Sequence, residues 1–281
     1  MAEAIERGQA PQIAAGAGVG PTVDSRITAP PSPVPEIRDM PVAMIPAVLR
    51  AGWRDFRRAP AFGLFFSGVY ALGGIVLWLV LSASGREWWL VPFFLGFPLL
   101  APFAAIGLYE VSRRIEAGEP LDWRAVLGVV FAQKDRQLPS MAVVVLLLFM
   151  FWMFIAHMTV ALFLGLQAMT NVTSDPWGVL LSGNGRAMLA FGTLVGGAFA
   201  AVLFAFTVVG LPLLLDREID FITAIITSVQ AVAANPVAMT IWAATIAGVM
   251  FLGMLPLFLG LLVVLPVLGH ASWHMYRNLT A

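Results

Sequence analysis

Residues 140–166 read SMAVVVLLLFMFWMFIAHMTVALFLGL, an apolar run that contains no Asp, Glu, Lys or Arg. An α-helix needs about 20 such residues to cross the roughly 30 Å of hydrocarbon in a bilayer. Similar uncharged runs cover residues 60–83, 88–109 and 187–215, and a longer one covers residues 237–276. These runs predict a protein whose helices cross a membrane several times.

The composition supports the same class. Of the 281 residues, 60% are hydrophobic and 11% are charged, whereas a soluble globular protein carries about 25% charged residues. The zero net charge, from 16 basic and 16 acidic residues, argues against a nucleic-acid partner. The absence of cysteine excludes disulfides, thiolate nucleophiles, iron–sulfur clusters and cysteine zinc sites.

The last apolar run must fold back on itself. As one helix, residues 237–276 would be about 60 Å long, twice what a bilayer accommodates. We expect the reversal around Gly253-Met254-Leu255-Pro256, because proline lacks the amide donor that a helix needs. The predicted fold is therefore an all-α polytopic membrane protein with six transmembrane helices that pair as hairpins.

The basic residues predict the orientation of these helices, because Lys and Arg are retained on the cytoplasmic side. With six spans, 14 of the 16 basic residues lie on one side, and only Arg86 and Arg186 lie on the other. We therefore expect a multi-pass membrane protein with both termini in the cytoplasm. The loops near Arg86 and Asp175 are then periplasmic.

The first 40 residues differ from the rest of the chain. They are rich in Ala, Gly and Pro, and they contain neither an apolar run nor the basic and apolar start of a secretory signal. We expect residues 1–40 to form a disordered cytoplasmic tail and residues 41–281 to form the membrane domain.

The membrane domain shows a weak internal repeat. Three times an amphipathic segment precedes a proline, at Pro60, Pro139 and Pro236, and a pair of apolar runs follows it. The predicted unit is an interfacial helix followed by a transmembrane hairpin. Its three copies cover about residues 41–115, 120–215 and 218–278.

The first amphipathic segment is basic. Its arginines fall on one side of a helix, whereas Trp53 and Phe56 fall toward the apolar side; the arginines are Arg50, Arg54, Arg57 and Arg58. Such a helix is typical of an anionic membrane surface. A plain topological anchor is the simpler interpretation, and recognition of a lipid or a partner protein is the alternative.

Two motifs carry a family resemblance: GWRDFRRAP at residues 52–60 and LPVLGHASWHMYR at residues 265–277. In these motifs the chain resembles a family of predicted bacterial integral membrane proteins called domain of unknown function 2189, over roughly residues 36–280. The resemblance implies a bacterial inner-membrane protein. Some relatives are labelled as cytochrome c oxidase components, but the family supplies no catalytic or binding residues.

The predicted spans offer little chemistry. They contain no Asp, Glu, Lys or Arg, which argues against ion-coupled transport and voltage sensing. His270 and His274 share one helix face and could bind a metal with His157, or His157 could bind haem. A depth mismatch of about 10 Å between His157 and that pair argues against both. We therefore predict no catalytic, cofactor-binding or metal-binding residues, and no enzymatic activity.

Small residues on the predicted spans indicate a function based on helix association and not on catalysis or cofactor binding. Gly73, Gly74, Gly192 and Gly196 permit close approach of helices, either within the chain or between two chains. The leading functional hypothesis is a non-enzymatic accessory or scaffold of a membrane complex, a respiratory one included, that acts in the lipid bilayer through a membrane-protein partner. The alternative is a passive transporter or lipid-handling protein with a cavity between the repeats.

Overall fold

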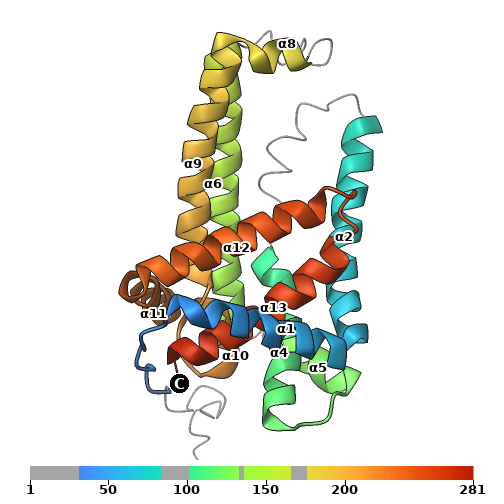
Figure 1. Ribbon diagram of the computed structural model, residues 1–281, viewed down its shortest axis with the longest axis vertical. Coiled ribbons are helices and arrows are strands. Elements are labelled where there is room, and N and C mark those ends of the chain that lie inside the picture. Colours follow the sequence, from blue (N-terminus) through green and yellow to red (C-terminus); the bar gives the residue numbers. More distant parts are fainter. Residues whose placement is uncertain (1–31, 84–100, 133–135, 166–175, 281) are drawn as a thin grey trace, which may run out of the picture. The chain divides into compact units, whose positions relative to one another are not determined.

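The computed structural model describes residues 32–83, 101–132, 136–165 and 176–280, which all belong to one compact unit, Ser32–Ala281 (Figure 1). Every regular element in these ranges is helical, as predicted. After a short 3-10 helix, Val42–Met44, the helices are α1 (Ile45–Arg58), α2 (Pro60–Ala83), α4 (Ala101–Ala117), α5 (Trp123–Ala132), α6 (Leu138–Leu164), α8 (Pro176–Leu181), α9 (Gly183–Thr207), α10 (Gly210–Asp216), α11 (Phe221–Ala234), α12 (Pro236–Met254) and α13 (Leu261–Thr280).

Within the described residues, four helical stretches are long and apolar enough to cross a membrane. They are Pro60–Val80, Leu138–Leu164, Gly183–Asp216 and Pro236–Met254. The third stretch contains both α9 and α10. The predicted number of six spans is not confirmed, because most of residues 88–109 lies outside the described ranges and α13 does not qualify as a span.

The predicted reversal after α12 is confirmed. The helix ends at Met254, and α13 begins at Leu261. Between them Leu257 and Phe258 adopt positive φ angles of 51° and 65°, which are uncommon for bulky residues. A Cβ atom on Gly260 would lie 2.6 Å from the carbonyl oxygen of Gly253. The turn is apolar. Because Gly260 has no side chain, its backbone can lie against the backbone of Gly253 near the end of α12.

Helix α13 is central to the packed part of the protein, and α1, α2, α4 and α12 all contact it. Its most buried side chains include Trp273, Met275, Tyr276 and Leu279. A Cβ atom on Gly52 of α1 would lie 2.5 Å from the carbonyl oxygen of Val267 on α13. The apolar face of α1 therefore packs on α13, and only the opposite face of α1 is free to meet a membrane surface.

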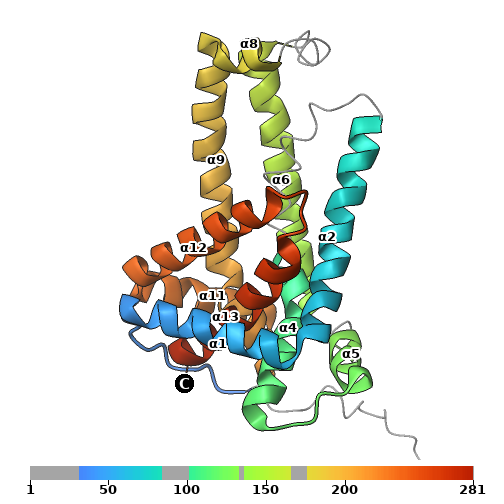
Figure 2. The same ribbon diagram turned by 45° about the vertical axis from the view of Figure 1, so that its right-hand side comes forward.

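The two longest spans form a hairpin. Figures 1 and 2 show α6 and α9 side by side, whereas α12 runs across them. Gly196 of α9 supports this contact, because its Cβ position lies 3.4 Å from Nε1 of Trp152 on α6. A Cβ atom on Gly192 or on Gly73 of α2 would meet nothing within 4 Å. Of these three glycines, only Gly196 serves the predicted packing within the described chain.

The helix order repeats in part. Helices α2, α6 and α12 each begin with Pro60, Pro139 or Pro236 in the first helical turn, and each follows a short helix: α1, α5 or α11. Proline suits this position because its fixed φ angle matches a helix and it needs no amide donor. The elements that follow these three helices differ from one another, so the three-repeat architecture is not confirmed.

The described part of the predicted tail is bound to the helices. Asn235, between α11 and α12, accepts a hydrogen bond from the Met40 backbone (2.7 Å) and donates one to the Arg38 carbonyl (3.1 Å). The Arg38 amide donates to the Leu279 carbonyl at the end of α13. Residues 32–40 thus lie against the membrane domain, whereas residues 1–31 lie outside the described ranges.

Candidate functional site

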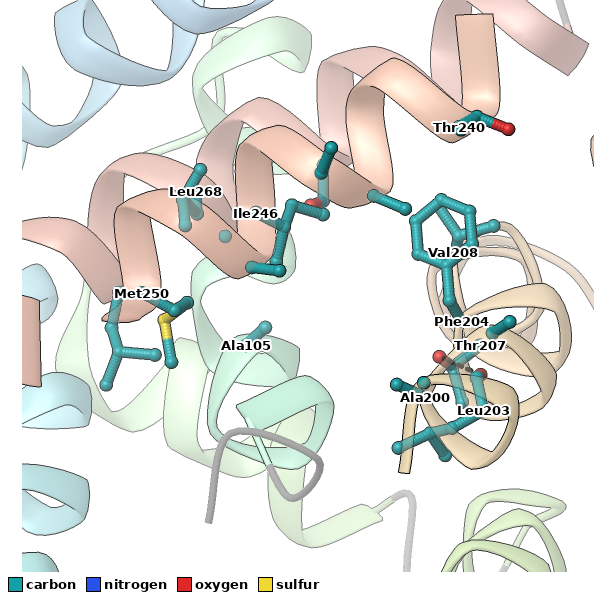
Figure 3. A pocket seen from close by; sticks show the side chains of 18 of the residues that line it. Ala105, Ala200, Leu203, Phe204, Thr207, Val208, Thr240, Ile246, Met250 and Leu268 are labelled. Carbon is teal, nitrogen blue, oxygen red and sulfur yellow. Dashed lines mark hydrogen bonds between the residues drawn. The ribbon is translucent and has the colours of Figure 1, made fainter. Parts of the chain in front are cut away.

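An apolar cavity of about 430 Å³ is the first candidate site. Helices α4, α9, α12 and α13 line it, and Figure 3 shows Phe204 of α9 and Val208, which directly follows α9, facing Ile246 and Met250 of α12 across the opening. Ligand cavities in proteins usually have volumes of about 300–1,000 Å³. The cavity is therefore large enough for a small apolar molecule or part of a lipid.

Small side chains create this space. Alanines 200 and 201 on α9 and alanines 243, 244 and 247 on α12 line the cavity, so neither helix projects a bulky side chain from these positions. None of the described lining residues is charged. Among the described lining residues, the polar side chains are Tyr109, Thr207, Thr240 and Ser272, and the Thr207 hydroxyl donates to the Leu203 carbonyl of its own helix (2.7 Å). The lining is suited to binding apolar groups and holds no acid–base pair.

A buried polar cluster lies between α1, α4 and α13. Asp55 of α1 is only 2% exposed, and its Oδ2 atom accepts hydrogen bonds from Ser112 (3.0 Å) and from Nε2 of His274 (2.7 Å). The Ser112 hydroxyl also contacts Nδ1 of His270 at 2.7 Å. The cluster thus connects three helices that are far apart in the sequence.

The hydrogen-bond geometry assigns the proton of His270. A carboxylate only accepts hydrogen bonds, so the single hydroxyl proton of Ser112 points to Asp55. Nδ1 of His270 must then carry a proton and donate it to the Ser112 oxygen. Nε2 of His270 is then the ring nitrogen without a proton, and it is buried. The His270 imidazole is therefore neutral, with its one proton on Nδ1.

The pKa values in the cluster follow from burial and charge. Burial lowers the pKa of His270 to about 4, although the charge of Asp55 opposes this effect. Burial alone would raise the pKa of Asp55, but the hydrogen bond and charge of His274 and the hydrogen bond of Ser112 outweigh it and lower that pKa. At neutral pH the cluster therefore contains an ionised Asp55 and a neutral His270.

The structure brings two of the three histidines together but does not form a metal site from them. His270 and His274 both approach the Asp55–Ser112 pair, whereas His157 lies on α6, where its Nδ1 contacts the Met153 carbonyl at 2.7 Å. Within the described residues, no group of three or more His, Cys, Asp or Glu side chains could hold a metal ion. The cluster acts as a structural link between the three helices.

A second polar network lies at the end of α4. Glu110 is completely buried, and Arg113 and Arg114 donate to its carboxylate oxygens at 2.6–2.9 Å. Both arginines also pair with Glu119. A buried carboxylate is costly unless it is paired in this way, so the two arginines stabilise the end of α4.

The same end of the molecule joins α4 to α10 and α13. Trp273 donates through Nε1 to Glu116 (2.9 Å), and Nε of Arg277 donates to the other oxygen of Glu116 (3.1 Å). The hydroxyl of Tyr276 donates to Asp216 at 2.7 Å. This network places charged groups one helical turn beyond the apolar cavity.

The free face of α1 is basic. All four arginines are exposed on it, while the single acid of the helix, Asp55, points inward. Phe56 is buried, whereas Trp53 is 45% exposed. Trp53 lies at the edge of the packed face, with its ring centre 5.8 Å from that of Phe56. The exposed face thus combines arginines with one tryptophan, as in helices that lie on anionic membranes.

The four long apolar helices of the described residues are those of an α-helical integral membrane protein, and two of them, α9 and α12, line the apolar cavity. A family model described as "Predicted integral membrane protein (DUF2189)" matches residues 90–216, and this match confirms the resemblance to that family. The function of the family is unknown. The matched residues do not include the two motifs at residues 52–60 and 265–277. No curated protein and no solved structure matches the chain.

The apolar cavity and the polar cluster were not identified from the sequence as sites. The alternating alanines of α9 and α12 were a visible signal for close packing or empty space, but not for which helix faces them. Asp55 carried a signal of its own, because it is the single acid in a basic helix and falls on the same side as Val48 and Gly52.

Proposed function

We propose that this protein handles lipids by taking an acyl chain of a membrane lipid into the apolar cavity. The observation that carries the proposal is the cavity of about 430 Å³, in which none of the lining residues that the structure describes is charged. Two of its walls, α9 and α12, belong to stretches that are long and apolar enough to cross a membrane. Acyl chains are therefore the apolar groups most available to it.

The accessory or scaffold role is the second candidate, and a different observation favours it. A Cβ atom on Gly192 of α9 would meet nothing within 4 Å, so this glycine does not serve the contact with α6. Small residues on a membrane helix allow a partner helix to approach closely. A membrane-protein partner is thus the alternative to a lipid as the ligand of this protein.

We place the protein in a bacterial inner membrane with both termini in the cytoplasm and assign it no enzymatic activity. The distribution of 14 basic residues against two supports the orientation. A carboxy-terminal alkaline phosphatase fusion, which is active only in the periplasm, is expected to be inactive. An active fusion would refute the orientation.

The lipid proposal is tested by filling the cavity. We expect the purified protein to bind the fluorescent fatty acid cis-parinaric acid, and Ala200→Trp to abolish that binding because the indole occupies the cavity. Ala198→Trp is the matched control, since Ala198 is exposed on the same helix and does not line the cavity. Equal binding by both variants, each folded by circular dichroism, would overturn the proposal.

The scaffold candidate predicts a separate effect. Gly192→Leu meets open space within the chain, so it is expected to leave folding and cis-parinaric acid binding unchanged. If a partner helix uses this face, the variant loses a complex that the wild type retains on native gel electrophoresis in mild detergent. An unchanged migration relative to the wild type would remove this candidate.

A further inference from the structure

A second cavity, of about 310 Å³, lies at the polar ends of α4, α10 and α13. It differs from the apolar cavity in its chemistry. Of the residues that the structure describes, two arginines, two carboxylates, one tryptophan and one alanine line it: Arg113, Arg277, Glu116, Asp216, Trp273 and Ala117. The positive and negative side chains balance, so the cavity offers partners for both signs of charge.

The two cavities lie on the same faces of two helices. On α4, Tyr109 lines the apolar cavity and Arg113 lines the charged one. On α13, Gly269 lines the apolar cavity and Trp273 lines the charged one. Residues four apart share a helix face and are separated by about 6 Å along the axis. The charged cavity is therefore one helical turn beyond the apolar cavity.

The charged groups retain capacity for a ligand. The side chains of Arg113, Arg277 and Glu116 are 29%, 37% and 40% exposed. The ion pair between Arg277 and Asp216 spans 3.7 Å, which is too long for a hydrogen bond. A guanidinium has five N–H donors, and Arg277 uses its Nε–H on Glu116. An anionic group could thus bind Arg277 without breaking the contact to Glu116.

We propose that the charged cavity binds the zwitterionic headgroup of a phospholipid whose acyl chain occupies the apolar cavity. The phosphate binds Arg277, and the ammonium group binds Glu116 and Asp216. Arg113, which donates to Glu110 and Glu119, adds positive charge beside the phosphate. A purely anionic ligand would meet both carboxylates, and a ligand without a chain would leave the adjoining apolar cavity empty. This inference rests on the lipid-handling function proposed above.

The ligand is tested with lipids that differ only in the headgroup. Purified protein in detergent is titrated with phosphatidylethanolamine or phosphatidylglycerol of identical chains, and bound lipid is counted by native mass spectrometry. We expect tighter binding of phosphatidylethanolamine. Arg277→Gln is expected to weaken that binding about tenfold or more, the loss typical of one hydrogen bond to a charged group. Arg277→Lys keeps the charge and is expected to retain part of the affinity.

Two controls make the outcome specific. Glu116→Gln, at a partly exposed side chain, is a second variant that is expected to reduce the preference between the headgroups if Arg277→Gln fails to fold. Arg186→Gln changes an exposed arginine of α9 that does not line either cavity, and it is expected to change nothing.

The failures of the two proposals are distinguishable. Equal affinity for both phospholipids, with cis-parinaric acid still bound, overturns the headgroup site and leaves the lipid-handling function intact. Loss of all acyl-chain binding overturns both. Displacement of the phospholipid headgroup by free phosphoethanolamine with equal affinity assigns the cavity to a soluble ligand and also overturns the proposal.

Discussion

His270 makes the stability of the protein depend on pH in a defined window. Its pKa of 6.5 in an unfolded chain falls to about 4 in the folded protein, because the ring is buried. Between pH 4 and pH 6.5, His270 is therefore protonated in the unfolded chain and neutral in the folded protein. Stability is complete above pH 6.5 and falls as the pH drops toward 4. At 1.36 kcal/mol for each pKa unit, the full loss is about 3 kcal/mol.

The perturbation that isolates this effect is His270→Asn. The Asn amide keeps a donor toward Ser112 and cannot titrate in this window, whereas Asp55, with a pKa below its ordinary 3.8, stays ionised throughout it. Unfolding free energies would be measured in mixed dodecylmaltoside–SDS micelles at pH 7 and pH 4.5. We expect the unfolding free energy of the variant to be lower than that of the wild type at pH 7. On acidification to pH 4.5, we expect it to fall by about 2–3 kcal/mol less than that of the wild type.

A packing control separates titration from lost contacts. Leu268→Ala removes a buried side chain from the same helix, so it lowers stability at both pH values but retains the wild-type pH dependence. Equal losses on acidification in the wild type and in His270→Asn would refute the assignment of a low pKa to His270.

Three further changes test the packing. Gly52→Leu places atoms against the α13 backbone and is expected to lower the unfolding free energy by at least about 1–3 kcal/mol, whereas Gly128→Leu on α5 meets open space and serves as its neutral control. Glu110→Ala leaves two arginines without their buried partner and is expected to cost about 3–5 kcal/mol in the same unfolding assay. Asn235→Ala is expected to release residues 32–40, which faster tryptic cleavage at Arg38 would report; unchanged cleavage would contradict this role.

Some features of this fold could be predicted from the sequence because they depend on local spacing. The uncharged runs predicted α2, α6, α9 and α12 as apolar helices, and three prolines marked the start of α2, α6 and α12. The reversal after Met254 followed from length alone, since a single helix would exceed the bilayer. Each inference uses residues that are close in the chain, where helix geometry fixes their relation.

Other features depend on which helices meet, and the tertiary structure decided them. Asp55 is buried because His274, 219 residues away, and Ser112 satisfy its carboxylate. Glu110 ends an apolar run and is buried because two arginines of the next turn fold back onto it. The cavity exists where α9 and α12, which contribute small alanines to its lining, come together with α4 and α13. Spacing along one helix predicts a face, but the partner of that face is set by contacts between distant segments, whose energies no local pattern encodes.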